Sequence, residues 1–141
     1  MLFEINGVKI TERGWAGHFI CSDKCQFKRN TLLEYQDKKW IVSTVGALRQ
    51  PETLRKIPEF YSENGYELIG FNRYYETMAF DAQPVKDDDE SVIYYDANVG
   101  KVINFDSNWA IDHIDFKTDK LANEMHEQVV NELIKKIKEK D

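Results

Sequence analysis

Residues 121–140 read LANEMHEQVVNELIKKIKEK and carry apolar side chains at helical spacing. Because apolar residues recur every three to four positions, this stretch predicts an amphipathic helix with one apolar face. The apolar positions are Leu121, Ala122, Met125, Val129, Val130, Leu133, Ile134 and Ile137. Thr118 or Asp119 can cap the start of the helix. His126 stands between Glu124 and Glu127 and is expected on the exposed face.

Upstream of this helix, short apolar runs alternate with turn residues, which predicts strands joined by tight connections. Asn6-Gly7 is the clearest turn, because both of its residues tolerate positive φ, and it predicts a hairpin over residues 2–12. Further strands are expected over residues 16–21, 25–35, 40–48, 66–71, 73–82, 91–98 and 101–105, with turns at 22–24 and 99–100. Pro51 can begin a short helix over 52–61.

Many strands followed by a terminal helix predict an α+β fold. We expect an antiparallel β-sheet built from hairpins, with the C-terminal amphipathic helix packed on one face. A length of 141 residues suits a single domain over 1–141. No apolar run approaches the ~20 residues that a bilayer-spanning helix needs, and MLFEINGVKI lacks the pattern of a signal peptide. We therefore expect a cytoplasmic protein without a membrane partner.

The net charge of −6 is spread unevenly along the chain. Residues 61–120 hold 5 Lys/Arg against 13 Asp/Glu. A protein that binds DNA or RNA through the phosphate backbone is expected to be strongly basic, so general nucleic-acid binding is excluded. The acidic 87–119 region leaves open a protein-binding inhibitor that mimics nucleic acid.

The segment from Arg13 to Thr31, RGWAGHFICSDKCQFKRNT, concentrates chemically active side chains. Within it, His18, Cys21 and Cys25 have the spacing H-x2-C-x3-C, and a turn at 22–24 would set the two cysteines facing each other. Zinc sites use such nitrogen and sulfur ligands, with His113 or Asp112 as a possible fourth. Reduced thiols packed in the core are the commoner outcome, so no cofactor is expected. A reactive Cys–His pair is a further alternative.

The same segment and two later strands carry the side chains of an anion-binding site. Arginine forks bind phosphate, aromatic rings stack on bases, and small polar side chains orient a ligand. The candidates are Arg13, Lys28, Arg29 and Arg73 for phosphates, Trp15, Phe27, Tyr74 and Tyr75 for stacking, and His18, Asn30, Thr31, Ser43 and Thr44 for orientation. Glu76 joins this set, and it could be a general base if it is buried. The alternative is that these are solvated charges beside core aromatics.

Four stretches also carry a resemblance: GWAGHFICSDKCQFKRNTLLEY, STVG, YYETMAF and the NWAIDHIDF…ANEMHE ending. They are similar to a set of short, uncharacterised proteins carried by phages and mobile elements. The resemblance implies a setting in which small acidic proteins serve as counter-defence factors. One such class is the homo-oligomeric sponge, which sequesters an immune-signalling nucleotide without cleaving it. The candidate site over residues 13–31 is loosely similar to the pockets of these sponges.

The leading hypothesis is therefore a phage-type, homo-oligomeric protein that binds and sequesters a small anionic nucleotide in a basic and aromatic pocket, without catalysis. Two alternatives stay open. The first is an enzyme that hydrolyses nucleotides or uses a Cys–His pair. The second is the acidic protein-binding inhibitor.

Overall fold

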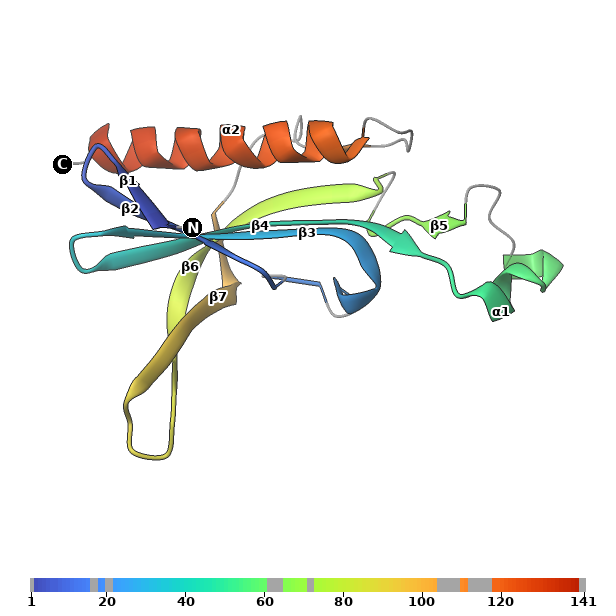
Figure 1. Cartoon of the computed structure of the whole chain (residues 1–141), viewed down its shortest axis with the longest axis horizontal. Coiled ribbons are helices and arrows are strands. Elements are labelled where there is room, and N and C mark those ends of the chain that lie inside the picture. The colour runs from blue at the N-terminus through green and yellow to red at the C-terminus, as the bar shows by residue number, and fades with distance from the viewer. Residues whose placement is uncertain are drawn as a thin grey trace.

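A computed structural model describes residues 2–15, 18–19, 22–60, 65–70, 73–103, 110–111 and 118–139. Within these residues, eight strands form one antiparallel sheet. Six of them follow the order β1 (Leu2–Ile5), β2 (Val8–Arg13), β3 (Cys25–Tyr35), β4 (Lys38–Arg49), β6 (Tyr75–Lys86) and β7 (Val92–Ile103). The short strands β5 (Tyr66–Glu67) and β8 (Ala110–Ile111) pair with β4 and β6. Helix α2 (Thr118–Glu139) lies along one face of the sheet (Figure 1). The α+β prediction is confirmed.

The hairpin turn predicted at Asn6-Gly7 joins β1 to β2, with φ of 52° and 82° at its two residues. The long strands β3 and β4 form where strands were predicted, and β4 contains the strong strand formers Trp40, Ile41, Val42, Thr44 and Val45. Between β4 and β5, the expected helix over 52–61 is divided into α1 (Glu52–Arg55) and the 3-10 turn η2 (Pro58–Phe60). Pro58 has no N–H to continue the helix.

The predictions of strands over 16–21 and 66–71 were inaccurate. Residues 16, 17, 20 and 21 of the expected 16–21 strand lie outside the described residues, and His18 and Phe19 are not in a strand. The expected turn at 22–24 is the 3-10 turn η1 (Ser22–Lys24). The 66–71 strand stops at Glu67, because Gly70 and Arg73 form a tight bridge after it.

The predicted turn at Val99-Gly100 is a bulge within the single strand β7. Phe80 of β6 pairs with Val102 and Ala82 pairs with Ala97, so residues 98–101 of β7 stand opposite Asp81 alone. β7 pairs with β6 on both sides of this bulge, which is why the chain does not reverse there.

The two faces of the sheet differ in what covers them. The face under α2, here called the helix face, carries Ile10, Leu33, Val42 and Ala79 against Val129, Val130, Leu133 and Ile134 of the helix. The opposite face, here called the far face, carries a smaller cluster of Leu32, Ile41, Phe80 and Ala97. Successive residues of a strand alternate between the two faces.

The apolar stripe of α2 is correctly predicted in its C-terminal half and shifted in its N-terminal half. Leu121 is 38% exposed, whereas Ala122 and His126 are buried. The row Thr118, Ala122, His126 and Val130 faces the sheet, because residues four apart lie on one side of a helix. The prediction of an exposed His126 was therefore wrong.

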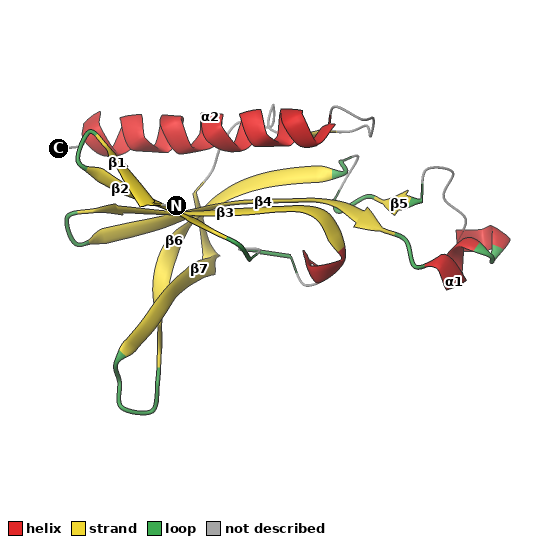
Figure 2. Ribbon diagram, viewed as in Figure 1, coloured by secondary structure: helices red, strands yellow, loops and turns green. Residues whose placement is uncertain are grey.

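Strand β7, at the edge of the sheet, covers one side of the far face. β6 and β7 turn away from α2 and leave the plane of the other strands (Figure 2). As a result, the Arg13 guanidinium of β2 donates a hydrogen bond to the carbonyl of Tyr95 in β7, four places away in the strand order. We call this junction, formed by Arg13, Trp15, Tyr94, Tyr95 and Asp96, the seam.

Candidate functional site

The predicted site residues divide between the two faces of the sheet. One group lies on the far face, where Arg13 bonds to Asn30 and a separate chain joins Ser43, His18, Glu76 and Arg73. A second group contacts α2 or the aromatic core beneath it: Phe27, Arg29, Thr31, Thr44 and Tyr75, with Tyr74 beside it. Lys28 is exposed and donates to the carbonyl of Asp23. The structure therefore does not bring the candidates together in one pocket.

A hollow of about 450 Å³ lies at the seam and is lined by Trp15, Ile93, Tyr94 and Asp96. The Trp15 and Tyr94 rings meet edge to face, with centroids 6.1 Å apart. Both residues are exposed, Trp15 to 46% and Tyr94 to 42%. The volume of this hollow falls within the range of small-molecule sites.

Arg13 stands beside this hollow, with its guanidinium carbon 4.6 Å from the centre of the Trp15 ring. Its Nη2 donates to Asn30 Oδ1 over 2.9 Å. Burial lowers the pKa of Arg13 from its ordinary value, and the Asp96 carboxylate opposes that shift. A partly desolvated cation with an aromatic ring against it is a typical element of phosphate and nucleotide sites.

Two N–H groups at this place have no hydrogen-bond partner among the residues that the structure describes. They are Nε of Arg13 and Nδ2 of the fully buried Asn30. The amide of Asn30 is held in this orientation because its oxygen accepts from Arg13. An unsatisfied buried donor costs about 1–3 kcal/mol, so these two groups lower the stability of the seam.

A hydrogen-bonded chain continues along the far face from Ser43. Ser43 Oγ lies 2.7 Å from His18 Nδ1, and His18 Nε2 lies 3.1 Å from Glu76 Oε1. The His18 ring also packs against Phe80, with centroids 5.4 Å apart. The hydrogen bond from His18 lowers the pKa of Glu76, against the opposing effect of burial.

Arg73 completes this chain through an ion pair, with its Nε 2.7 Å from Glu76 Oε2. A Cβ on Gly70 would stand 2.6 Å from the same Nε, so the glycine leaves room for the guanidinium. Serine, imidazole and carboxylate in this order are the parts of a hydrolytic relay. Ser43, however, is fully buried in the middle of β4 and has no accessible surface for a substrate.

The helix face holds a second polar chain, centred on the buried His126. Thr31 donates to Glu12 Oε1 over 2.8 Å, so its oxygen must accept the N–H of His126 Nε2, 2.6 Å away. His126 Nδ1 then accepts from Thr44, at 2.8 Å, and Thr44 accepts from Thr77, at 2.7 Å. Burial, with the charge of Arg29, lowers the pKa of His126 to about 3.

Arg29 and Tyr75 also form their hydrogen bonds and ion pairs on the helix face. Arg29 Nη2 lies 2.7 Å from Glu12 Oε1, and its Nη1 reaches Asn123 and Glu127 of α2. Tyr75 is buried, and its hydroxyl donates to Asp119 over 2.5 Å. Burial and the Asp119 hydrogen bond raise the pKa of Tyr75. These two candidates hold the helix on the sheet.

The metal hypothesis stays a prediction. Cys25 is buried at the start of β3, while Cys21, Asp112 and His113 lie outside the described residues. Within the part of the chain that is described, no three His, Cys, Asp or Glu side chains converge as metal ligands do.

Sequence reasoning missed several residues that the structure brings into these networks, among them Glu12, Thr77 and His126 on the helix face and Tyr94, Tyr95 and Asp96 at the seam. The i, i+4 spacing of His126 from Ala122 and Val130 could have indicated its burial. Tyr94 and Asp96 carry no such pattern, because their place at the seam depends on the turn of β7 towards β2.

Comparison with models of protein families, with curated proteins and with solved structures finds no match to this chain. None of the described helices is both long and apolar enough to cross a membrane.

Proposed function

We propose that the protein binds a small anionic nucleotide at the seam and sequesters it without catalysis. Arg13 pairs with a phosphate, and the accessible rings of Trp15 and Tyr94 contact the base. The Asp96 carboxylate accepts the N–H of Ala97. Its remaining lone pairs accept hydrogen bonds from ribose hydroxyls or from an exocyclic amine of the base.

The observation that carries this proposal is the Arg13 cation beside an accessible aromatic hollow. The guanidinium carbon of Arg13 lies 4.6 Å from the centre of the Trp15 ring, and Trp15 itself is 46% exposed. An anionic group pairs with this cation, whereas a neutral apolar ligand does not.

The resemblance to short phage and mobile-element proteins supports a counter-defence role in the cytoplasm of a host cell. The homo-oligomer in this proposal is supported by β7, whose Ile93 and Val99 are 61% and 65% exposed. An exposed apolar strand at the end of a sheet offers backbone groups to another strand, here one from a second copy.

Isothermal titration and native mass spectrometry with cyclic dinucleotides, ADP-ribose and AMP test the binding. At least one nucleotide is expected to bind intact, and Arg13→Ala is expected to weaken it by at least about tenfold, or 1.4 kcal/mol. The matched control is Arg49→Ala, an exposed arginine at the end of β4. Equal affinity in the two variants, or no binding by the native protein, overturns the proposal.

Hydrolysis of the nucleotide is the second candidate, because Ser43, His18 and Glu76 form a hydrogen-bonded chain on the far face, although Ser43 itself is buried. Chromatography of the nucleotide after incubation separates the two functions, because a sponge returns its ligand unchanged. Turnover that disappears in Ser43→Ala, with nucleotide affinity retained, would assign the chain to catalysis.

A further inference from the structure

Arg13 and Asp96 stand at the same hollow of the seam without forming an ion pair. Asp96 lines the hollow, and Arg13 lies against the Trp15 ring that borders it. The Asp96 carboxylate opposes the lowering of the Arg13 pKa, so the two charges are close enough to interact. Within the part of the chain that the structure describes, however, neither side chain makes an ion pair. The hollow therefore presents a cation and a carboxylate to the same ligand.

The balance of charge at the hollow limits the charge of the ligand. Arg13 is a single cation, and the carboxylates of Asp96 and Glu34 both act on it. A triphosphate would bring several negative charges towards these carboxylates, and like charges side by side are costly. A phosphodiester carries one negative charge and matches the one guanidinium. We therefore expect a cyclic mononucleotide or a cyclic dinucleotide to bind better than a nucleoside triphosphate.

The Asp96 carboxylate keeps hydrogen-bonding capacity for the base of the ligand. Its Oδ1 accepts the N–H of Ala97 over 2.8 Å, and the side chain makes no other hydrogen bond within the described residues. An ionised carboxylate has about four acceptor sites on its two oxygens. Asp96 is half-buried and shares the hollow with Trp15 and Tyr94. A charged acceptor in such a place binds a donor more strongly than it would in open water.

Guanine is the base whose donors fit a carboxylate. Its N1–H and its exocyclic N2–H₂ are adjacent on one edge and point the same way, so each can reach one carboxylate oxygen. Adenine and cytosine offer an exocyclic amine beside a ring nitrogen that is an acceptor, and the lone pair of that nitrogen repels the second oxygen. Uracil places its one N–H between two carbonyl oxygens. A carboxylate therefore distinguishes guanine from the other bases by a pair of charge-assisted hydrogen bonds.

We propose that the seam selects a guanine nucleotide whose phosphate is a singly charged diester. Asp96 accepts hydrogen bonds from N1–H and N2–H₂ of guanine, the rings of Trp15 and Tyr94 contact the base, and Arg13 pairs with the phosphodiester. Asp96 is thus the residue that determines base specificity, whereas Arg13 contributes to the binding of every nucleotide. This inference rests on the nucleotide binding proposed above for the seam.

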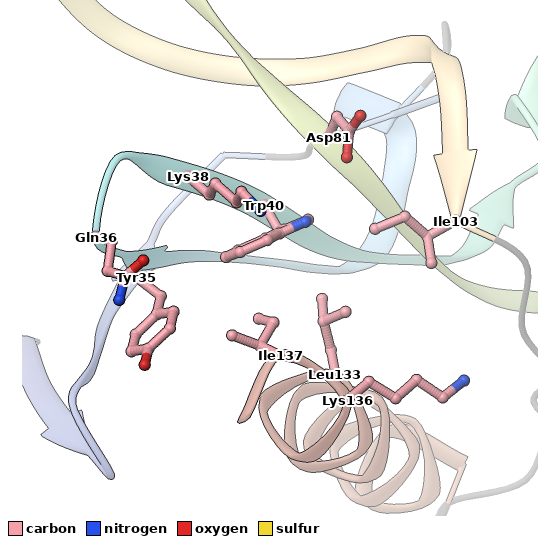
Figure 3. Close-up of a pocket in the computed structure, with 9 residues that line it drawn as sticks. All are labelled: Tyr35, Gln36, Lys38, Trp40, Asp81, Ile103, Leu133, Lys136 and Ile137. Atoms are coloured by element: carbon pink, nitrogen blue, oxygen red, sulfur yellow. The ribbon is translucent and has the colours of Figure 1, made fainter. Parts of the chain in front are cut away.

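A second cavity, of about 360 Å³, supplies a matched control. It lies between the C-terminal half of α2 and the β3–β4 hairpin, and Figure 3 shows Leu133 and Ile137 on one side of it and Trp40 on the other. Asp81 lines this cavity and is half-buried, as Asp96 is at the seam. The described lining of this cavity contains no arginine, so we do not expect it to bind the nucleotide. Asp81→Asn therefore removes a comparable carboxylate away from the seam.

Titration calorimetry with cyclic GMP, cyclic IMP, cyclic AMP and GTP tests the specificity. Cyclic GMP is expected to bind at least about tenfold more tightly than cyclic AMP or GTP. Cyclic IMP should fall between cyclic GMP and cyclic AMP, because it keeps N1–H and lacks the exocyclic amine.

Asp96→Asn keeps an oxygen for the N–H of Ala97 and loses the second acceptor. It should weaken the binding of cyclic GMP at least about tenfold and leave the affinity for cyclic AMP nearly unchanged. Asp81→Asn should bind every probe as the native protein does.

Equal affinity of the native protein for cyclic GMP and cyclic AMP overturns the guanine assignment, and so does an unchanged ratio of the two affinities in Asp96→Asn. Loss of cyclic GMP binding in Asp81→Asn would place the guanine site in the other cavity. Tighter binding of GTP than of cyclic GMP contradicts the selection of a singly charged phosphate. In each of these cases a nucleotide still binds. Absence of binding by any nucleotide, cyclic dinucleotides included, overturns the proposed function as well, so the two failures are distinguishable.

Discussion

The side chains of Asn30 and Thr31 lie on opposite faces of the sheet, although the residues are adjacent in β3. Asn30 accepts a hydrogen bond from Arg13 on the far face, and Thr31 accepts one from His126 of α2 on the helix face. This alternation separates a polar chain that anchors the helix from a polar chain that borders the accessible hollow. Substitutions in the first chain are therefore expected to change stability, and substitutions beside the hollow are expected to change nucleotide binding.

The buried imidazole of His126 makes stability depend on pH. The pKa of His126 is lowered to about 3 in the folded protein, against an ordinary value of 6.5 for histidine. Between these values the unfolded chain binds a proton that the folded protein does not, so stability falls as the pH falls below 6.5. The slope from this residue is at most about 1.4 kcal/mol per pH unit.

Urea unfolding at intervals from pH 7 to pH 5 measures that slope. His126→Gln is expected to flatten it, because glutamine has no proton to take up in the unfolded state. A variant as steep as the native protein would show that other groups cause the dependence.

Arg29 is expected to contribute to stability and not to nucleotide binding. Arg29→Met removes the ion pair with Glu12, whose carboxylate stays partly buried, and should lower the free energy of unfolding by about 1–3 kcal/mol. Nucleotide affinity should equal that of the native protein. Loss of affinity with unchanged stability would move the binding site to the helix face.

Tyr75 is expected to fasten the start of α2 to the sheet. Tyr75→Phe removes the hydrogen bonds to Asp119 and Thr118 and should cost about 1–3 kcal/mol of stability. Tyr66→Phe, whose hydroxyl bonds to the exposed Gln26, is the control and should cost less. Thermal unfolding compares the pair, and equal losses would contradict this role of Tyr75.

Gly46 is required where β4 meets β6. A Cβ at this position would stand 2.5 Å from the Tyr74 carbonyl oxygen and 2.6 Å from the Tyr75 ring, and its φ is 155°. Gly46→Ala should therefore destabilise the protein by at least about 1–3 kcal/mol. Gly14→Ala meets no atom within 4 Å, so its unfolding midpoint should stay near that of the native protein. Similar midpoints for both variants would show that the sheet relaxes around Gly46.

Local sequence patterns determined the regular elements of the fold. Asn6 and Gly7 both tolerate the positive φ that their turn requires. The apolar and β-branched residues of β3 and β4 favour extended strands. The apolar stripe of 121–140 similarly determined that a helix covers a sheet. These predictions depend on residues close together in the chain, which is why they could be made without the tertiary structure.

Only the tertiary structure decided which residues share a site. Arg13 meets Tyr95 because β6 and β7 turn towards β2, and no local pattern encodes that approach. His126 is buried because Thr31 and Thr44 satisfy both of its nitrogens, although its neighbours in sequence are charged. Strand alternation places Arg13 and Asn30 of the 13–31 cluster on the far face, and Arg29 and Thr31 on the face that α2 covers.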